Sequence, residues 1–484
     1  MSLELAKLGA ALGGAGLAAL LVAPQRPIRL AGLAALALGG AFLAGYLVPA
    51  GSGNLLAAAV VVGIPFALAG ALLLRRRPWL LPLAALVCVP ARIPLDVGGT
   101  EANLLLPLYA VIAAAGAALA WSLYLGEGDS RELGPIAWPL AALVAFAGLS
   151  LSWSDDPGQG AITLLFFVLP FGVLAVCLSR LPWRRAPLGY LFGLLAAMAV
   201  AFAAIGVFQW ITRDVFWNPK VIVGNAYAPF YRVNSVFWDP SIYGRFLVIA
   251  ILAGLVLVLG VASRRLACGA AALIAIVLVG LLFSFSQSSF AALMAGTLAA
   301  AAFVWRWRAA AAAALAGVVL LSAGMAAPSV RHSIFDASDK GLNRATSGRF
   351  GLITDGAKIA FDHPVAGVGL GGFKRAYADK TGLRGEEPKK AASHNTPVTV
   401  AAELGFPGLA LLAWLVAAGL LTAFRAIPIG GFEGRAALVF GLALGAIAVH
   451  SLFYDAFFED PMTWGLLALA ALVSTTTRQP EVAS

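Results

Sequence analysis

Long apolar segments follow one another along most of this 484-residue chain, separated by short polar stretches. Most of them approach the roughly 20 residues that a helix needs to cross a bilayer, and they carry almost no charge. The pattern predicts an all-α polytopic membrane protein with about 12–15 transmembrane helices. The segments lie near residues 8–24, 28–50, 54–74, 79–90, 103–125, 135–152, 161–178, 188–212, 241–262, 267–283, 288–304, 309–326, 397–423, 436–454 and 461–474, and the first and fourth are the weakest.

One polar interruption, at residues 327–396, is much longer than the others, and a loop of this length is usually functional. It divides the chain into N-terminal transmembrane helices (1–134), central transmembrane helices (135–326), the loop (327–396), and C-terminal transmembrane helices with a short cytoplasmic tail (397–484). Within the loop, apolar positions at helical spacing in SGRFGLITDGAKIAFDHP predict an amphipathic helix. The following GVGLGGF predicts a tight turn, because no strand and helix flank it as in a dinucleotide site.

Composition supports a membrane protein. The chain is 61% hydrophobic and 12% charged, with a mean hydropathy of +0.91, whereas soluble proteins carry about twice that charged fraction. The net charge of +10 does not indicate nucleic-acid binding, because no basic run contains interleaved aromatic residues. The three cysteines lie in apolar segments and are expected to be small core residues.

Basic residues in the short loops predict the orientation of the chain, because such loops face the cytoplasm. Counting spans places five basic clusters on one side, which we take as cytoplasmic. The loop 327–396 then lies on the opposite, extracytoplasmic face. The clusters are Arg75–Arg77; Arg180, Arg184 and Arg185; Arg264 and Arg265; Arg306 and Arg308; and Arg425 and Arg435.

The stretch ASHNTPVTVAAELGFPG, residues 392–408, combines polar groups with the start of an apolar helix. Thr396 and Pro397 are expected to be its N-cap and first helical residue. His394 then lies just before a helix N-terminus, where the partial positive charge favours neutral imidazole. Thr396, Thr399 and Glu403 share one face, with Glu403 roughly 10 Å inside. An ionisable group at that depth is a functional candidate, although an interfacial histidine and a glutamate bonded between helices would also be ordinary.

Arginines on the same outer face suggest an anionic ligand. Arg232 comes just before a membrane helix, for which Asp239-Pro240 is a second expected cap. Arg245 lies in the first turns of that helix, where its side chain either snorkels or faces a polar cavity with Arg232. Arg349 lies on the long loop. Guanidinium groups are preferred partners for phosphate oxygens, so this face suits a diphosphate together with a hydroxyl that awaits deprotonation.

These motifs resemble the O-antigen ligase/polymerase family of bacterial membrane glycosyltransferases. The signature His-Asn, nine residues, Gly, two residues, Gly is complete: His394-Asn395, TPVTVAAEL, Gly405 and Gly408. YRVNSVFWDP resembles the family's arginine-containing stretch, and WSDDP at 153–157 resembles a weaker outer-loop element. The resemblance covers Trp153 to Trp464. The segment before the signature also has its expected residues, which are Arg349, Pro364, Gly367, Gly369 and Phe373.

The resemblance implies transfer of a glycan from an undecaprenyl-diphosphate carrier to an acceptor hydroxyl, at the outer face of the bacterial cytoplasmic membrane. It implies that His394 is the general base, with Glu403 orienting the acceptor and Asn395 as part of the signature. Arg232 would bind the diphosphate, with Arg349 as a second cation.

One departure from the family concerns the turn SFSQSSF, where relatives often have Ser-Arg. Gln287 or Ser289 occupies that place here, which leaves Arg245 to substitute. We expect no cofactor and no metal, because the carrier bond is already activated and Asp155 and Asp156 of WSDDP form a weak ligand set.

Three alternatives remain open at this point. The acceptor is either another lipid-linked glycan, which makes the protein a polymerase of repeat units, or a protein hydroxyl, which makes it an oligosaccharyltransferase. A flippase for lipid-linked oligosaccharides is a different class. Transporters concentrate charged residues near the midplane and show related halves, whereas this chain gathers its ionisable residues at the outer face, which favours an enzyme.

Overall fold

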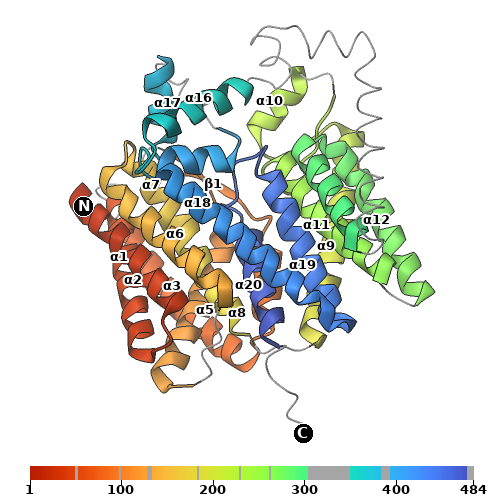
Figure 1. The fold of residues 1–484 in the computed structure, drawn as a ribbon, viewed down its shortest axis with the longest axis horizontal. Helices are drawn as coiled ribbons and strands as arrows, with labels where there is room; N and C mark the ends of the chain where they lie inside the picture. Colours follow the sequence, from red (N-terminus) through yellow and green to blue (C-terminus); the bar gives the residue numbers. More distant parts are fainter. Residues whose placement is uncertain are drawn as a thin grey trace.

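The computed structural model describes residues 1–48, 53–97, 100–127, 133–181, 185–227, 230–260, 263–303, 349–382 and 393–476. Helices make up nearly all of its regular structure (Figure 1). They are α1 (Leu3–Val22), α2 (Arg26–Leu47), α3 (Gly53–Arg76), α4 (Leu80–Cys88), α5 (Leu106–Leu125), α6 (Ala137–Ser150), α7 (Pro157–Thr163), α8 (Leu169–Ser179), α9 (Arg185–Thr212), α10 (Pro219–Tyr227), α11 (Pro240–Gly260), α12 (Arg264–Ser284), α16 (Arg349–Asp362), α17 (Phe373–Thr381), α18 (Thr396–Arg425), α19 (Gly431–His450) and α20 (Pro461–Thr476).

The expected all-α polytopic architecture is confirmed. Ten helices in the described residues are long and apolar enough to cross a membrane. Two shorter apolar helices, Gln287–Phe303 and Pro461–Thr475, accompany them. The expected segment 309–326 lies outside the described residues.

The apolar segment at 79–90 is not a span. It forms only α4, whose nine residues rise about 14 Å. An antiparallel hairpin follows, which the sequence pattern did not predict: β1 (Ile93–Val97) pairs with β2 (Thr100–Leu104). Between α4 and the hairpin, Arg92 Nη2 donates to the backbone oxygen of Glu459 at 2.8 Å. The short helix therefore brings a cation to the loop between α19 and α20.

Small residues let the first two helices pack backbone against backbone. A Cβ on Gly16 would lie 2.5 Å from the carbonyl oxygen of Gly32, and one on Gly39 would lie 2.4 Å from that of Gly9. Lipid chains are as apolar as leucine, so helices in a bilayer gain from close van der Waals contact more than from hydrophobic burial. Glycines at these crossings permit that contact.

The amphipathic helix expected in the long loop is confirmed as α16, which packs on α18 at one end of the molecule together with α17 (Figure 1). The expected tight turn follows it, and the WSDDP segment holds that turn in place. Asp155 N donates to Val368 O at 3.0 Å, and Ser154 Oγ donates to Leu370 O at 2.7 Å. Asp156 caps α7 by accepting from Gln159 N at 3.0 Å. The segment thus connects the loop to the transmembrane helices.

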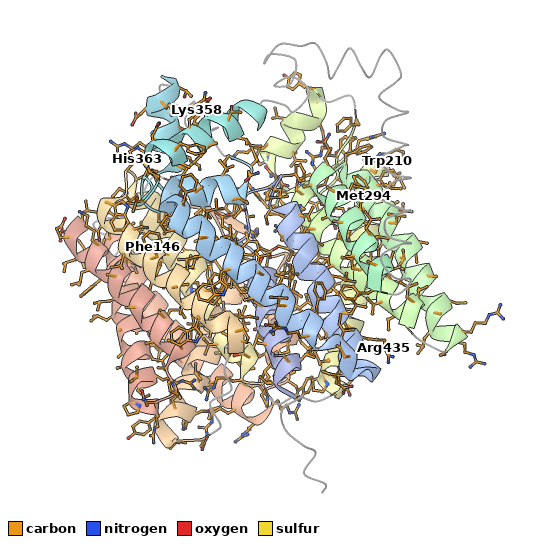
Figure 2. All side chains as sticks on the ribbon, in the orientation of Figure 1. Phe146, Trp210, Met294, Lys358, His363 and Arg435 are labelled. Atoms are coloured by element: carbon orange, nitrogen blue, oxygen red, sulfur yellow. The ribbon has the colours of Figure 1, made fainter. Side chains whose placement is uncertain are left out.

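Lys358 and His363 lie at one end of the molecule and Arg435 lies at the other (Figure 2). Arg435 Nη1 donates to Gly260 O at 3.3 Å, so the N-terminus of α12 lies at the Arg435 end. Because both ends carry cations, these labelled residues alone do not give the orientation. The five arginine clusters lie in short loops, which predicts that the Arg435 end is cytoplasmic.

This orientation predicts different labelling of two exposed positions. In a variant whose three cysteines are replaced by serine, Lys380→Cys on α17 should react with an impermeant maleimide in intact cells, after permeabilisation of any outer membrane. Arg265→Cys at the start of α12 should react only after lysis. Both native side chains are exposed, so burial does not explain a difference. The reverse labelling pattern would show that the chain is inserted the other way round.

Candidate active site

A cavity of about 360 Å³ lies beneath the α16–α17 end of the molecule. Its wall comes from α6, α7, the turn before α17, the start of α17, the residue before α11, the start of α18 and the loop between α19 and α20. His394 and Glu403 both line it, together with Thr396 and Thr399. The sequence-based expectation that these groups share one face therefore agrees with the geometry. The charged or titratable residues in the described lining are Asp239, Lys374, His394, Glu403, Tyr454, Asp455 and Glu459.

His394 adopts an uncommon backbone conformation with φ of +53°. Residues other than glycine seldom adopt this left-handed region, and such strain tends to occur at functional positions. On either side of it, Asn395 N donates to Ser393 Oγ at 3.1 Å and Thr396 N donates to Ser451 O at 2.9 Å. These two hydrogen bonds fix the bend that directs the histidine into the cavity.

The helix cap differs from the expected one by one residue. Asn395, not Thr396, is the N-cap of α18: its Oδ1 accepts from Val398 N at 2.9 Å. Its Nδ2 donates to Leu452 O at 2.9 Å. The amide accepts and donates at once, and the hydroxyl of Thr396 donates to Asp455. Asn395 does not line the cavity. Its Oδ1 caps α18, and its Nδ2 holds the histidine-bearing turn against the segment that follows α19.

Asp455 is a site residue that the sequence reasoning missed. Thr396 Oγ1 donates to Asp455 Oδ1 at 3.0 Å, and Thr399 Oγ1 donates to Asp455 Oδ2 at 2.5 Å. Burial raises the pKa of Asp455, while the two hydroxyls and the charge of nearby His394 act in the opposite direction. Burial likewise raises the pKa of Glu459, against the charge of Arg92. The polar run FYDAFFEDP between two apolar segments was the available signal.

Glu403 faces the cavity from inside α18 and is only 9% exposed. Its Oε1 accepts from Phe373 N, the first amide of α17, at 3.3 Å. Because the backbone of α17 holds one oxygen, the carboxyl group is fixed in direction. Glu403 therefore joins the helix that carries the signature to the helix that forms the roof of the cavity.

The signature glycine Gly405 interrupts α18 two residues after Glu403, with φ of +66° and ψ of −173°. The interruption frees backbone groups, and the turn after α16 uses them. Gly369 N donates to Glu403 O at 2.9 Å, Val368 N donates to Ala402 O at 2.9 Å, and Phe406 N donates to Pro364 O at 2.8 Å. The glycine-rich turn and the signature thus form one backbone-to-backbone junction.

The arginines expected at the site lie elsewhere. Arg232 does not line the cavity: its Nε donates to Ser284 O at 3.2 Å, and Asn225 bonds both of its backbone polar groups. Arg245 neither snorkels nor faces the cavity. It is 2% exposed, and its Nη2 lies 2.7 Å from Asp460 Oδ2. A membrane-buried arginine needs a partner, and Asp460 is that partner. The expected cap of α11 is confirmed, since Asp239 Oδ1 accepts from Ser241 N at 2.6 Å.

The remaining expected ligands lie at the N-terminal ends of other helices. Gln287 is the first residue of the helix Gln287–Phe303, and its side chain is exposed. Arg349 is the first residue of α16. In the turn beside Gln287, Ser288 Oγ bonds His450 Nε2 at 3.0 Å. His450 is fully buried, and sequence reasoning overlooked this fourth histidine.

The fold and the cavity define a polytopic membrane protein with a histidine and several carboxyl groups at one end of its helix bundle. The O-antigen ligase family model matches residues 270–413, which contain His394, Glu403 and both signature glycines. This match supports the resemblance seen in the motifs for this part of the chain. A search of curated proteins found no match. Arg232 and Asp455 lie outside the matched residues.

Proposed function

We propose that the protein is a ligase-type glycosyltransferase, which moves a glycan from an undecaprenyl-diphosphate carrier to an acceptor hydroxyl. The reaction takes place at the outer face of the bacterial cytoplasmic membrane. The observation that carries this proposal is the cavity that brings His394, Glu403 and Asp455 together. His394 and Glu403 lie in residues 270–413, which the O-antigen ligase family model matches. Such a cavity provides a base and carboxyl groups, and it is large enough for sugar rings.

In the proposed reaction, the acceptor hydroxyl attacks the anomeric carbon of the donor sugar. The new bond joins the acceptor oxygen to that carbon, and the bond from the carbon to the diphosphate oxygen breaks with its electron pair. The hydroxyl proton passes to neutral His394, and the lipid diphosphate leaves. Attack opposite to the leaving group inverts the anomeric configuration. A positioned base contributes about 10²–10⁴-fold to such a step.

Two carboxyl groups support the histidine in this scheme. Asp455, near His394 and fixed by two threonine hydroxyls, stabilises the imidazolium that forms. Glu403, fixed by Phe373 N, accepts a hydrogen bond from the acceptor and orients it. Because both carboxyl groups are held by protein donors, they need little reorganisation during the reaction, which is what makes an active site electrostatically effective.

The donor approaches along a cationic outer surface in this proposal. Arg232 and Arg349 receive the carrier diphosphate, with Gln287 on the neighbouring turn as a hydrogen-bonding group. The position of Arg232 supports its role in binding the diphosphate. It precedes α11 at the end of the bundle that we take as outer, and its Nε donates to Ser284 O at the end of α12. Arg245 contributes indirectly, by holding Asp460 and with it the start of α20.

The Asp455→Asn variant should lose about 10²–10³-fold in turnover number. An amide cannot stabilise imidazolium as a carboxylate does. Its oxygen can still accept from one of the two threonine hydroxyls while its NH2 group donates to the other, so the fold of the loop should persist. Donor binding should stay within a few-fold of wild type. The measurement is steady-state transfer by purified variant in nanodiscs, together with its melting temperature. A turnover number equal to that of wild type would remove Asp455 from the mechanism.

A transfer assay with purified protein tests the function itself. It requires a lipid-diphosphate glycan of defined length and candidate acceptors, with and without EDTA. We expect one glycan chain to be attached per acceptor, and the same rate in EDTA because the carrier bond needs no Lewis acid. A ladder of repeat units would instead identify a polymerase, and label on a protein would identify an oligosaccharyltransferase. Movement of the lipid-linked glycan across the bilayer without any transfer would identify a flippase.

A further inference from the structure

The proposed chemistry places a strong constraint on the cavity. An acceptor hydroxyl bonded to His394 lies about 3 Å from the ring nitrogen, and it must come to about 3–3.5 Å from the anomeric carbon. The leaving oxygen is bonded to that same carbon. The diphosphate must therefore come within on the order of 8 Å of His394, which places it in the same cavity.

Most charged groups of the cavity lining would repel an anionic ligand, and Lys374 is the exception. Asp239, Glu403, Asp455 and Glu459 line it, and carboxylates repel a diphosphate strongly where water is scarce. Lys374 is the one lysine or arginine in the described lining. Neither Arg232 nor Arg245 belongs to that lining.

Lys374 is also available to a ligand. Within the described residues, no carboxylate forms an ion pair with its ammonium group, although four line the same cavity. Its charge nevertheless lowers the pKa of both Asp455 and Glu459, so it faces the same space as these groups. Its position is fixed, because it follows Phe373, whose amide donates to Glu403.

We propose that Lys374 binds the diphosphate of the lipid-linked donor in the reacting complex and stabilises the charge that develops on the leaving oxygen. This inference rests on the proposed glycosyl transfer. Lys374 donates hydrogen bonds and keeps its proton throughout, so the proton balance of the reaction is unchanged. It complements Arg232, which meets the diphosphate outside the cavity, and it lies outside the residues that the motif resemblance singled out.

Lys374→Met tests the proposal, because methionine keeps the length of the side chain without its charge. The dissociation constant of undecaprenyl diphosphate should rise about 10- to 100-fold, the value of one hydrogen bond to a charged group. The dissociation constant of undecaprenol, which lacks the diphosphate, should stay unchanged. A general loosening of α17 would weaken both ligands alike. The turnover number should fall about 10²–10³-fold, as on removal of one oxyanion donor.

Two further variants serve as controls. Lys374→Arg keeps the charge and should bind undecaprenyl diphosphate within a few-fold of wild type. Lys380→Met removes a cation from the same helix, but Lys380 pairs with Asp362 and does not line the cavity, so binding and turnover should not change. Melting temperatures of all three variants show whether the fold is kept.

The outcomes separate this inference from the proposed function. Wild-type affinity for undecaprenyl diphosphate in Lys374→Met protein would overturn the role of Lys374, and equal weakening of undecaprenol would do the same. If the wild type transfers no glycan yet its diphosphate binding depends on Lys374, the proposed function fails while the anion site stands. If transfer depends on His394 and not on Lys374, only the present inference fails.

Discussion

Replacing His394 with alanine should lower the turnover number by about 10²–10⁴-fold, the usual contribution of a positioned general base. The affinity for the lipid-linked donor should remain nearly unchanged, because the diphosphate contacts lie on other residues. His394 lines the cavity and is held there in a left-handed backbone conformation, between two hydrogen-bonded neighbours. The measurement is the rate of glycan transfer at saturating donor, in parallel with a donor-binding titration.

His394→Gln is the variant that separates base from ligand. Glutamine can still accept a hydrogen bond from the acceptor hydroxyl, but it does not take up a proton near neutral pH. It should therefore be nearly as slow as alanine. His363→Ala is the matched control, because this histidine is exposed and does not line the cavity. If His394→Gln turned over like the wild type, the base would have to be another group, with Glu403 the first candidate.

The same role gives a direction for pH dependence. Transfer should slow as the solution becomes acidic, because imidazolium has no free electron pair with which to accept a proton. Asp455 acts in the same direction: burial raises its pKa, so it loses its charge at a higher pH than an exposed aspartate. In His394→Ala protein the residual rate should lose most of this acid dependence.

Gly405→Ala should reduce transfer by at least about 10²-fold, although residue 405 touches no substrate in our account. Its φ of +66° and ψ of −173° lie in a region that is essentially restricted to glycine, where other residues cost about 1–3 kcal/mol. A Cβ would also lie 2.7 Å from the carbonyl of Val365 and 2.8 Å from Pro364 O. The junction must then shift, and it carries Glu403. A misplacement of about 1 Å can cost 10²-fold in rate.

Gly382→Ala provides the comparison for Gly405. Gly382 also has a positive φ, +70°, but a Cβ there would meet nothing within 4 Å. It should therefore show backbone strain alone, with transfer within a few-fold of wild type. Rates and melting temperatures of both variants in nanodiscs decide the matter. Equal, small effects in the two variants would mean that the junction does not position Glu403.

Local patterns predicted the elements of this site well. Apolar period and length identified the transmembrane helices, and spacing placed Thr396, Thr399 and Glu403 on one face, where the cavity has them. These predictions succeed because helix geometry alone determines which side chains share a face. The amphipathic pattern of α16 succeeded for the same reason.

Contacts between distant segments could not be predicted in this way. Asp455 meets Thr399 across 56 residues, and no periodicity relates the two. Asp455 also accounts for the N-cap of α18, which the sequence placed at Thr396. The hydroxyl of Thr396 donates to Asp455, and Asn395 caps the helix instead. The ion pair between Arg245 and Asp460 joins segments that are also distant in the sequence. The same holds for the hydrogen bond from Arg92, which follows the short helix α4, to the backbone oxygen of Glu459.

The anomeric configuration of the product tests whether the acceptor hydroxyl attacks the donor sugar directly. A single turnover of purified wild-type protein with one defined lipid-diphosphate glycan gives a linkage whose configuration can be read by NMR, together with the amount of lipid diphosphate released. Direct attack by a hydroxyl that His394 deprotonates predicts complete inversion, with one lipid diphosphate released per linkage formed. Retention of configuration, or release of lipid diphosphate before any linkage forms, would rule out direct attack by the acceptor hydroxyl.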